Sequence, residues 1–247
     1  MAGTAVLRRL TWQVGTVEEV VDETPRVRTI VLDVPDWPGH RAGQHLDIRL
    51  TAEDGYRAER EYSIASAPGE QVAITVERLE DGEVSPYLTE ELRPGDGLEL
   101  RGPIGGYFVW GPDDGGPLLL VAGGSGVVPL RAIVRHRLRS GSDVPVRLLY
   151  SSRSLPDVIY RGELEQLGDG VEVVHTLTRE QPPGWTGFAR RVDEALLGEV
   201  AWPANDGAHA FVCGPTSFVE AVASGLVGLG YPPARVKTER FGATGVR

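Results

Sequence analysis

Cysteine is almost absent from this chain of 247 residues, in which Cys213 stands alone. A single thiol cannot form a disulfide within the chain. An iron–sulfur cluster usually needs about four thiolate ligands, which one cysteine cannot supply. The chain also lacks any run of about 18 uncharged apolar residues that could cross a membrane. Its first residues show no apolar stretch followed by a small-residue cleavage site, as a signal peptide would. We therefore expect a protein of the reducing cytoplasm with no membrane partner.

Positive charge is scarce as well, since the formal net charge is −10. Residues 1–110 hold 11 basic and 20 acidic side chains, whereas residues 111–247 hold 14 and 15. The excess of acid argues against nucleic acid as a partner, and the second half repels an anionic ligand far less than the first. The five histidines do not show the spacing of metal ligands, so we predict no metal site.

The first half of the chain has the pattern of β-strands. Short runs rich in β-branched residues are separated by turn signals, which predicts an antiparallel barrel. These runs cover residues 14–21, 26–34, 44–52, 58–66 and 71–79. Only Glu83–Leu92 has the pattern of a short helix in this half.

The second half alternates between strand and helix patterns, which predicts a parallel sheet flanked by helices. The apolar runs cover residues 118–122, 145–152, 171–177 and 208–214, and the helical patterns cover residues 127–139, 161–167, 192–200 and 216–230. The glycine-rich loop at residues 113–117 predicts a boundary between a first domain of residues 1–112 and a second of residues 113–247.

A glycine-rich turn, Gly123-Gly124-Ser125-Gly126, lies between the first strand and the first helix of the second half. Backbone N–H groups at a helix start are unpaired and the helix dipole adds positive character, so such a turn can hold a pyrophosphate. Pro129 replaces the third glycine of the usual dinucleotide motif, and an ordinary strand-to-helix turn is the alternative. The position at the first strand of a parallel sheet favours a phosphate site.

The end of the next strand indicates which nucleotide is bound. An NAD site usually places an acidic residue there, which accepts hydrogen bonds from the ribose 2′-hydroxyl. Here the strand ends in Ser151-Ser152-Arg153, and Arg179 follows the strand after it. Hydroxyl and guanidinium groups suit a 2′-phosphate, so we expect NADPH rather than NADH. Solvated loop arginines are the alternative.

A further motif, Arg60-Glu61-Tyr62-Ser63, lies on a predicted barrel strand, where Arg60 and Tyr62 share one face. It is followed in order by Gly82-Glu83-Val84-Ser85, Gly102-Pro103-Ile104-Gly105, the glycine turn and Cys213-Gly214-Pro215. This ordered set, spread over nearly the whole chain, resembles the ferredoxin–NADP⁺ reductase superfamily, in a form without an iron–sulfur domain. The resemblance implies a two-domain fold: an antiparallel six-stranded β-barrel that binds flavin, followed by a Rossmann-like parallel-sheet domain that binds NAD(P)H.

The resemblance also implies a role for each matching residue at the flavin. Arg60 would pair with the flavin phosphate, Tyr62 would stack on the isoalloxazine ring, and Ser63 would lie near its N5 atom. The helix beginning at Ser85 would offer N–H groups and a hydroxyl to the FAD pyrophosphate. Three further residues would contact the flavin: Val76, Gly82 and Val84. FAD is expected, with FMN less favoured.

At the nucleotide, the resemblance implies that the turn from Gly123 to Gly126 holds the NADPH pyrophosphate. Cys213 and Gly214 would border the nicotinamide together with Pro215, although a buried small hydrophobic residue is the alternative for Cys213.

At the end of the chain, Phe241 would cover a ring of the flavin. Glu239 would carry a proton, and a solvated terminal glutamate is the alternative for it. The expected catalytic residues are therefore Ser63, Cys213 and Glu239.

These implications together predict an enzyme that passes hydride from NADPH to FAD and then single electrons to a separate acceptor, such as a ferredoxin, a flavodoxin or an oxygenase. A flavin reductase that releases reduced flavin and a non-catalytic nucleotide-binding subunit are the alternatives. We expect a monomer. Arg131, Arg135 and Arg139 recur every four residues on a predicted helix, where they form either a docking stripe for an acidic partner or a solvated face.

Overall fold

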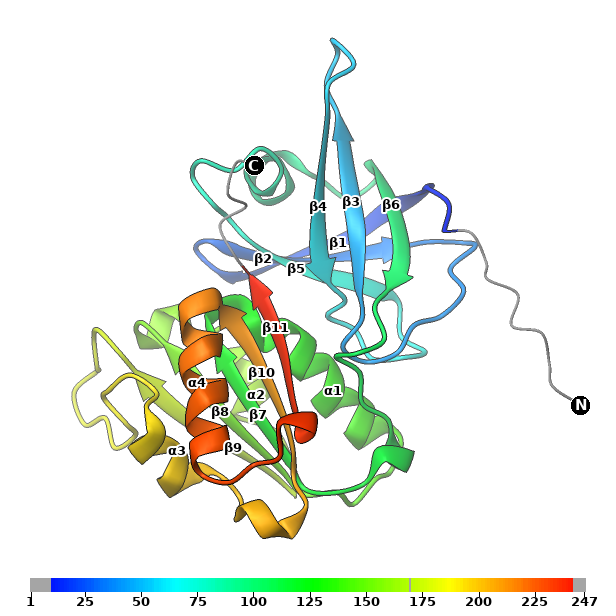
Figure 1. The fold of residues 1–247 in the computed structure, drawn as a ribbon. Helices are drawn as coiled ribbons and strands as arrows, with labels where there is room; N and C mark the ends of the chain where they lie inside the picture. Colours follow the sequence, from blue (N-terminus) through cyan, green and yellow to red (C-terminus); the bar gives the residue numbers. More distant parts are fainter. Residues whose placement is uncertain (1–9, 169, 242–247) are drawn as a thin grey trace, which may run out of the picture.

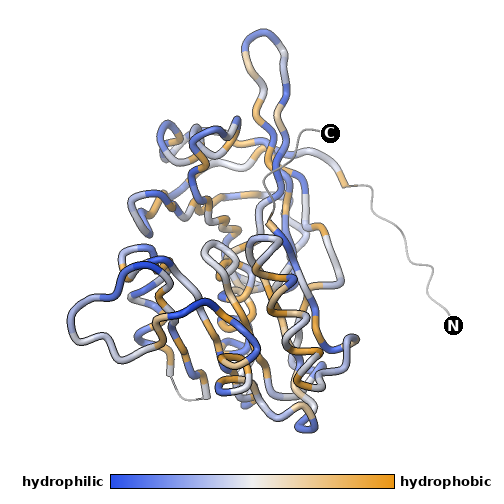
Figure 2. The backbone as a smooth tube through the Cα atoms, turned by 60° about the vertical axis from the view of Figure 1, so that its left-hand side comes forward, coloured by the Kyte–Doolittle hydropathy of each residue, from blue (hydrophilic) through white to orange (hydrophobic). Residues whose placement is uncertain are grey.

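The fold is that of a computed structural model, which describes residues 10–168 and 170–241. A six-stranded antiparallel sheet comes first in the chain and a five-stranded parallel sheet follows it (Figure 1). Hydrophobic segments gather in the strands and the long helices, whereas the hairpin between the third and fourth strands is hydrophilic at its tip (Figure 2). Within the described ranges, no helix is both long and apolar enough to span a membrane.

The antiparallel sheet has the strand order β4-β3-β6-β1-β2-β5. Its strands are β1 (Gln13–Thr24), β2 (Val27–Asp33), β3 (His45–Thr51), β4 (Arg57–Ser63), β5 (Val72–Glu77) and β6 (Gly97–Ile104). An antiparallel bridge between Ile64 and Ile74 joins the two edge strands, so the sheet closes into the predicted barrel. Its interior is filled by buried aliphatic side chains, among them Ile30, Leu46 and Leu100.

Five of these strands follow the sequence pattern, whereas β6 was expected only from the resemblance. The predicted helix over Glu83–Leu92 is shorter in the structure. It has a wide π-type turn at Tyr87–Glu91, and its N-cap is Pro86. Leu88 and Leu92 bury their side chains in the barrel core, so this segment caps one end of the barrel.

The parallel sheet has the strand order β11-β10-β7-β8-β9. Its strands are β7 (Leu118–Gly123), β8 (Val146–Ser152), β9 (Val171–Leu177), β10 (His209–Pro215) and β11 (Val236–Phe241), and its helices are α1 (Val127–Arg139), α2 (Arg161–Leu164), α3 (Glu194–Val200) and α4 (Thr216–Gly228). Short 3-10 turns lie at Pro112–Asp114, Gly124–Gly126, Leu155–Asp157, Ala204–Asp206 and Pro233–Arg235.

Strand β7 shows why the sheet is covered on both faces. All six of its residues are buried, as in a strand with helices on either side. Leu118 and Leu120 pack in the core that contains α1, whereas Leu119 and Val121 pack in the core that contains α3 and α4. Figure 1 shows α4 in front of the sheet and α1 behind it. The predicted parallel sheet flanked by helices is confirmed.

The two sheets share a core. The cluster that packs α1 against the parallel sheet also contains Phe108 and Trp110, which follow β6, and Ala42, Ala65 and Ala73 from the barrel. Trp110 is 1% exposed. The contact between the two halves is therefore a continuous apolar interior.

Polar contacts also join the two halves. Arg131, which is 13% exposed, binds Glu163 of α2 at 2.6 Å and donates to the carbonyl oxygen of Ala65 at 3.1 Å. Arg135 pairs with Glu70 of the barrel at 2.7 Å, and Arg139 lies 3.5 Å from the same carboxylate. The helical arginine stripe is thus neither a free docking face nor a simply solvated one, because it binds α1 to its neighbours within the molecule.

Candidate functional site

The structure brings the three expected catalytic residues together where the barrel meets the end of the parallel sheet. Strands β10 and β11 are parallel neighbours, and their register makes Cys213 and Glu239 Cα partners. Ser63 closes β4, and its buried hydroxyl donates to Oε1 of Glu239 at 3.2 Å. One hydrogen bond therefore spans the two domains at this point.

Glu239 is a carboxyl group that titrates near neutral pH. Burial raises its pKa to about 7, against the opposing effect of the Ser63 hydrogen bond, and the nearby Glu61 carboxylate raises it further. The group can therefore hold or release a proton in the physiological range.

Cys213 differs in character from Glu239. It is fully buried, and burial raises the pKa of its thiol well above the ordinary value. It is therefore a neutral packing group at the end of β10, with no thiolate available for attack.

Two of the predicted flavin-contact residues on β4, Arg60 and Tyr62, occupy one face of the strand. Tyr62 is half-buried against the barrel core, and burial raises the pKa of its phenol. The Arg60 guanidinium lies at the rim, where it binds Oε2 of Glu83 at 2.5 Å. The same carboxylate accepts a hydrogen bond from the Tyr56 hydroxyl at 2.9 Å. The expected phosphate-binding arginine is thus paired with an acid of the neighbouring loop.

The loop that carries Glu83 forms a compact turn. The Ser85 hydroxyl accepts a hydrogen bond from the N–H of Leu79 at 3.0 Å, and the N–H of Gly82 donates to the Leu79 carbonyl at 2.9 Å. A Cβ atom at Gly82 would lie 2.8 Å from the Ser85 hydroxyl oxygen, so glycine permits this close approach. Pro86 lacks an N–H group, which removes one of the donors expected at this helix start.

Two of the expected flavin contacts are buried in the barrel. Val76 and Val84 are 0% and 1% exposed and pack in the core. A flavin beside them would therefore meet their main chain, while their side chains fix the strand and the turn beneath it.

The glycine turn has the geometry of a phosphate cradle. Gly124 has φ +54° and open space where a Cβ would stand. A Cβ at Gly126 would lie 2.0 Å from the carbonyl oxygen of Cys213, so this glycine lets the turn pack directly on β10. Gly123 and Gly214 both lie against the ring of Phe218. The turn is thus fixed to the end of β10 with one open side.

A cavity of about 230 Å³ lies on this open side. Six of the predicted nucleotide residues line it: Gly123, Gly124, Ser125, Ser152, Arg153 and Pro215. Arg179 is exposed outside the lining set, with its N–H bonded to the Arg153 carbonyl at 2.9 Å. Phe241 ends β11 as the partner of Pro215 and packs half-buried on the shared core.

The cavity has walls that the sequence did not reveal. The unexpected lining residues include Thr24, Arg26, Val27, Glu77, Asp157, Ile159, Thr178 and Phe218. Asp157 and Glu77 place two acids beside Arg153, although the end of the strand itself carries none. Asp157 lies only four positions after Arg153, which is a signal that the sequence contained. The barrel residues had no local signal, because a distant part of the chain places them here.

The residues present fit a flavin at β4 and a pyridine dinucleotide at β7. A partly buried tyrosine lies next to a rim arginine, and a glycine turn opens onto a two-sided cavity. No group of His, Cys, Asp or Glu side chains in the described part of the chain is arranged to hold a metal ion. The fold and the site together define a two-domain oxidoreductase of the flavin- and nicotinamide-binding class.

Comparison with known proteins agrees with that class. Residues 15–109 match the model of the oxidoreductase FAD-binding domain, and residues 120–224 match that of the oxidoreductase NAD-binding domain. The chain is 37% identical over 229 residues to ferredoxin–NADP reductase B of Sorangium cellulosum, an alignment that covers 88% of this chain and 93% of that protein. The chain belongs to the ferredoxin–NADP⁺ reductase superfamily.

Other relatives are longer or form part of larger systems. The chain is 33% identical to the glycine betaine monooxygenase reductase subunit of Chromohalobacter salexigens, which covers 92% of this chain but only 63% of that protein. Among solved structures, the flavohem-like FAD/NAD-binding domain of nitric oxide dioxygenase from Vibrio cholerae superposes with a TM-score of 0.83 at 28% identity, covering 93% of this chain and 98% of that one.

Proposed function

We propose that this chain binds FAD and NADPH and passes electrons from NADPH to a separate one-electron acceptor. The observation that carries the proposal is the hydrogen bond between Ser63 and Glu239, which joins the flavin half to the nucleotide half beside Cys213. The chemistry that a bound flavin supplies is acceptance of a hydride from the nicotinamide and release of electrons one at a time.

The chain's own residues position the two cofactors. Arg60 holds the flavin phosphate, Tyr62 packs on the flavin ring, and the turn from Gly82 to Ser85 supplies main-chain and hydroxyl contacts, with Val76 and Val84 beneath. Burial of Tyr62 and the shared core keep water from the contact between the halves. Residues in these roles would hold the two rings in contact, which is the main contribution of a protein to hydride transfer.

The Ser63 hydroxyl and Oε1 of Glu239 form a short path for a proton. Because the pKa of Glu239 is about 7, the protonated carboxyl can pass its proton to the Ser63 oxygen as that hydroxyl gives up its own, and the carboxylate can then take up another proton from solvent. Cys213 and Gly214 would border the nicotinamide, and Phe241 would cover a ring of the flavin.

NADPH is the proposed donor rather than NADH. Ser152, Arg153 and Arg179 bind the 2′-phosphate, while the turn from Gly123 to Gly126 binds the pyrophosphate and Pro215 closes its edge. Asp157 and Glu77 line the same cavity, and their negative charges oppose the binding of a 2′-phosphate. NADPH is therefore preferred only if the arginines attract the phosphate more strongly than these two acids repel it. Anaerobic titration with each nucleotide, followed by the flavin absorbance, tests the proposal: NADPH should bleach the flavin at lower concentration than NADH.

The acceptor is proposed to be a ferredoxin, a flavodoxin or an oxygenase component. The names of the relatives support this, since they include a ferredoxin reductase and the reductase subunits of monooxygenases. We also propose a cytoplasmic monomer with domains of residues 1–112 and 113–247, whose ends at residues 1–9 and 242–247 lie outside the described residues. A purified protein that takes up no flavin would contradict the whole proposal.

A second candidate is an NAD(P)H-dependent flavin reductase that releases reduced flavin. The pairing of Arg60 with Glu83 favours it, because the carboxylate competes with a flavin phosphate for the guanidinium. Dialysis followed by turnover with added FAD or riboflavin distinguishes the two. Retention of FAD supports the electron-transfer reductase, whereas loss of FAD with full turnover on free flavin supports the second candidate.

A further inference from the structure

The cavity beside the glycine turn is built by both domains. Its floor and one wall belong to the parallel sheet, whereas Thr24, Arg26, Val27 and Glu77 enter from the barrel. The first three lie at the hairpin where β1 turns into β2: Thr24 ends β1, Arg26 is in the turn and Val27 begins β2. Anything that fills this cavity therefore touches the flavin domain as well as the nucleotide domain.

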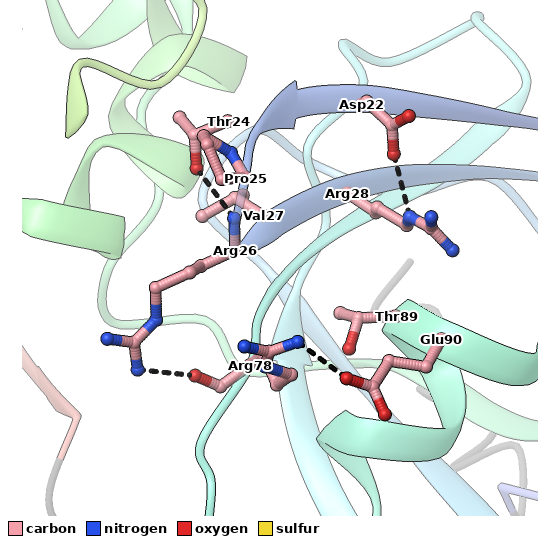
Figure 3. Close-up of a pocket in the computed structure, with 9 residues that line it drawn as sticks. All are labelled: Asp22, Thr24, Pro25, Arg26, Val27, Arg28, Arg78, Thr89 and Glu90. Carbon is pink, nitrogen blue, oxygen red and sulfur yellow. Dashed lines mark hydrogen bonds and ion pairs between the residues drawn. The ribbon is translucent and has the colours of Figure 1, made fainter. Parts of the chain in front are cut away.

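Arg26 is the cation that this hairpin presents. It also lines a second cavity of about 260 Å³, where Figure 3 shows its side chain extending away from Arg28 and toward the backbone of Arg78. Its Nη2 atom donates to the Arg78 carbonyl oxygen at 3.2 Å and lies 3.9 Å from Glu80. Glu80 is closer to Arg78, at 3.0 Å, so the charge of Arg26 is only weakly compensated.

Arg28 offers an internal comparison. It lies two residues further along the same hairpin and lines the second cavity but not the one beside the glycine turn. Its Nε atom is paired with Asp22 at 2.7 Å (Figure 3). The two arginines thus differ in access to the nucleotide cavity and in the strength of their ion pairs.

The charges around the nucleotide cavity indicate what Arg26 does. Arg153 is the cation contributed by the parallel sheet, and Glu77 and Asp157 are the acids on the wall. An anionic ligand that met Arg153 alone would face a net negative lining. When Arg26 is added to Arg153 and the two acids, the formal charge of the four side chains is zero. The N–H groups of the glycine turn then make the cavity favourable for a phosphate.

We infer that Arg26 binds a phosphate group of the pyridine dinucleotide from across the domain interface. The inference rests on the proposed function, since it takes the cavity to be the NAD(P)H site. It makes the barrel hairpin a second nucleotide-binding element, in addition to the residues that follow the strands of the parallel sheet. The dinucleotide then contacts both domains along its phosphates and not only at its nicotinamide.

The test is the affinity for NADP⁺, measured by isothermal titration calorimetry on the flavin-loaded protein, so that turnover is not the readout. We expect Arg26→Ala to raise the Kd for NADP⁺ roughly tenfold, as for loss of one charge-assisted hydrogen bond, and Arg26→Lys to raise it less. Arg28→Ala is the matched control and should stay within about twofold of wild type. Thermal unfolding of each variant verifies that the fold is retained.

Smaller ligands identify the phosphate. Loss of affinity for 2′,5′-ADP in Arg26→Ala supports a contact on the adenosine side, whereas a loss restricted to NADP⁺ supports a contact with the phosphate next to the nicotinamide ribose. The inference is overturned if Arg26→Ala binds NADP⁺ as wild type does, or if Arg28→Ala loses as much. A folded wild-type protein that binds neither NADP⁺ nor NAD⁺ would instead refute the proposed function itself.

Discussion

At the scale of single residues, Glu239 gives the molecule a dependence on pH. Its pKa is about 7 in the folded chain because of burial, whereas an unfolded glutamate titrates near 4.3. Between these values the folded state binds more protons than the unfolded state, so this residue makes stability fall as the pH rises from about 4.3 to about 7. Above that window the cost of burying the charge is fully present.

Glu239→Gln removes this charge and leaves a side chain that can still accept from Ser63. We expect the free energy of unfolding of the variant, relative to wild type, to increase as the pH rises. At pH 8 the variant should be roughly 1–3 kcal/mol more stable than wild type. Urea unfolding at pH 5 and at pH 8 measures the difference. Parallel pH curves for the two proteins would show that Glu239 ionises freely in the folded state.

A second residue-scale prediction concerns the pair of Arg60 and Glu83. Removing the competing carboxylate should free the guanidinium for a flavin phosphate. Glu83→Gln is therefore expected to lower the Kd for FAD and FMN by roughly threefold to tenfold, and to leave riboflavin binding unchanged because riboflavin has no phosphate. Flavin fluorescence quenching measures all three ligands.

Glu80→Gln is the control for this prediction. Glu80 is an exposed acid of the same loop that pairs with Arg78 and not with Arg60, so its loss changes the net charge equally. Equal tightening in both variants would mean that only the overall charge of the loop matters. Weaker FAD binding in Glu83→Gln would mean that Glu83 orients Arg60 instead of competing for it.

At the scale of elements, the glycine turn contains two glycines with different tasks. Gly126 has no room for a side chain, because a Cβ would lie 2.0 Å from the Cys213 carbonyl oxygen of β10. Gly124 has open space but a left-handed φ of +54°. We expect Gly126→Ala to lower the free energy of unfolding by about 3 kcal/mol or more, and Gly124→Ala by about 1 kcal/mol.

The variants Gly126→Ala and Gly124→Ala also distinguish an effect on packing from an effect on nucleotide binding. Gly124→Ala should keep its fold and bind NADP⁺ less tightly, because Gly124 lines the cavity and its new methyl group meets no protein atom. Chemical denaturation gives the stabilities and calorimetric titration gives the affinities. Gly126→Ala proving as stable as Gly124→Ala would contradict the close contact with β10.

Elements of the second half could be predicted because their signals are local. Strand β7 is a continuous apolar run, and α1 has helical periodicity over Val127–Arg139, so both patterns follow from neighbouring residues. Strand β6 has a weaker signal, since Gly97 begins it and Gly102 and Pro103 lie near its end. The sixth strand was predicted from the family resemblance of the ordered motifs and not from the residue pattern.

The catalytic roles of Ser63, Cys213 and Glu239 were expected from the resemblance of the motifs. The hydrogen bond between Ser63 and Glu239 was not expected, because residues 176 positions apart form it. The pairing of Glu83 with Arg60 and the presence of Arg26 at the nucleotide cavity were not expected. Both depend on how two distant segments approach, which neither periodicity nor spacing encodes.

At the scale of the whole molecule, the two domains share one interior. Phe108 and Trp110 of the first half are buried among side chains of β7 and α1. The Tyr160 hydroxyl donates to Thr75 of the barrel, and Arg135 binds Glu70. Separating the domains would expose this apolar surface and break these bonds, so neither half is expected to unfold alone.

We therefore predict one cooperative unfolding transition. Trp12 and Trp37 report on the barrel and Trp185 and Trp202 on the parallel-sheet domain, so Trp12→Phe/Trp37→Phe and Trp185→Phe/Trp202→Phe are matched variants. Each variant is unfolded in urea without added nucleotide. The midpoint of its fluorescence change should coincide with the midpoint of its far-ultraviolet circular dichroism change. A fragment of residues 1–112 should expose Trp110 and shift its emission to the red. Two separated transitions would mean that the interface contributes little, and that the alignment of flavin and nicotinamide depends on the bound ligands.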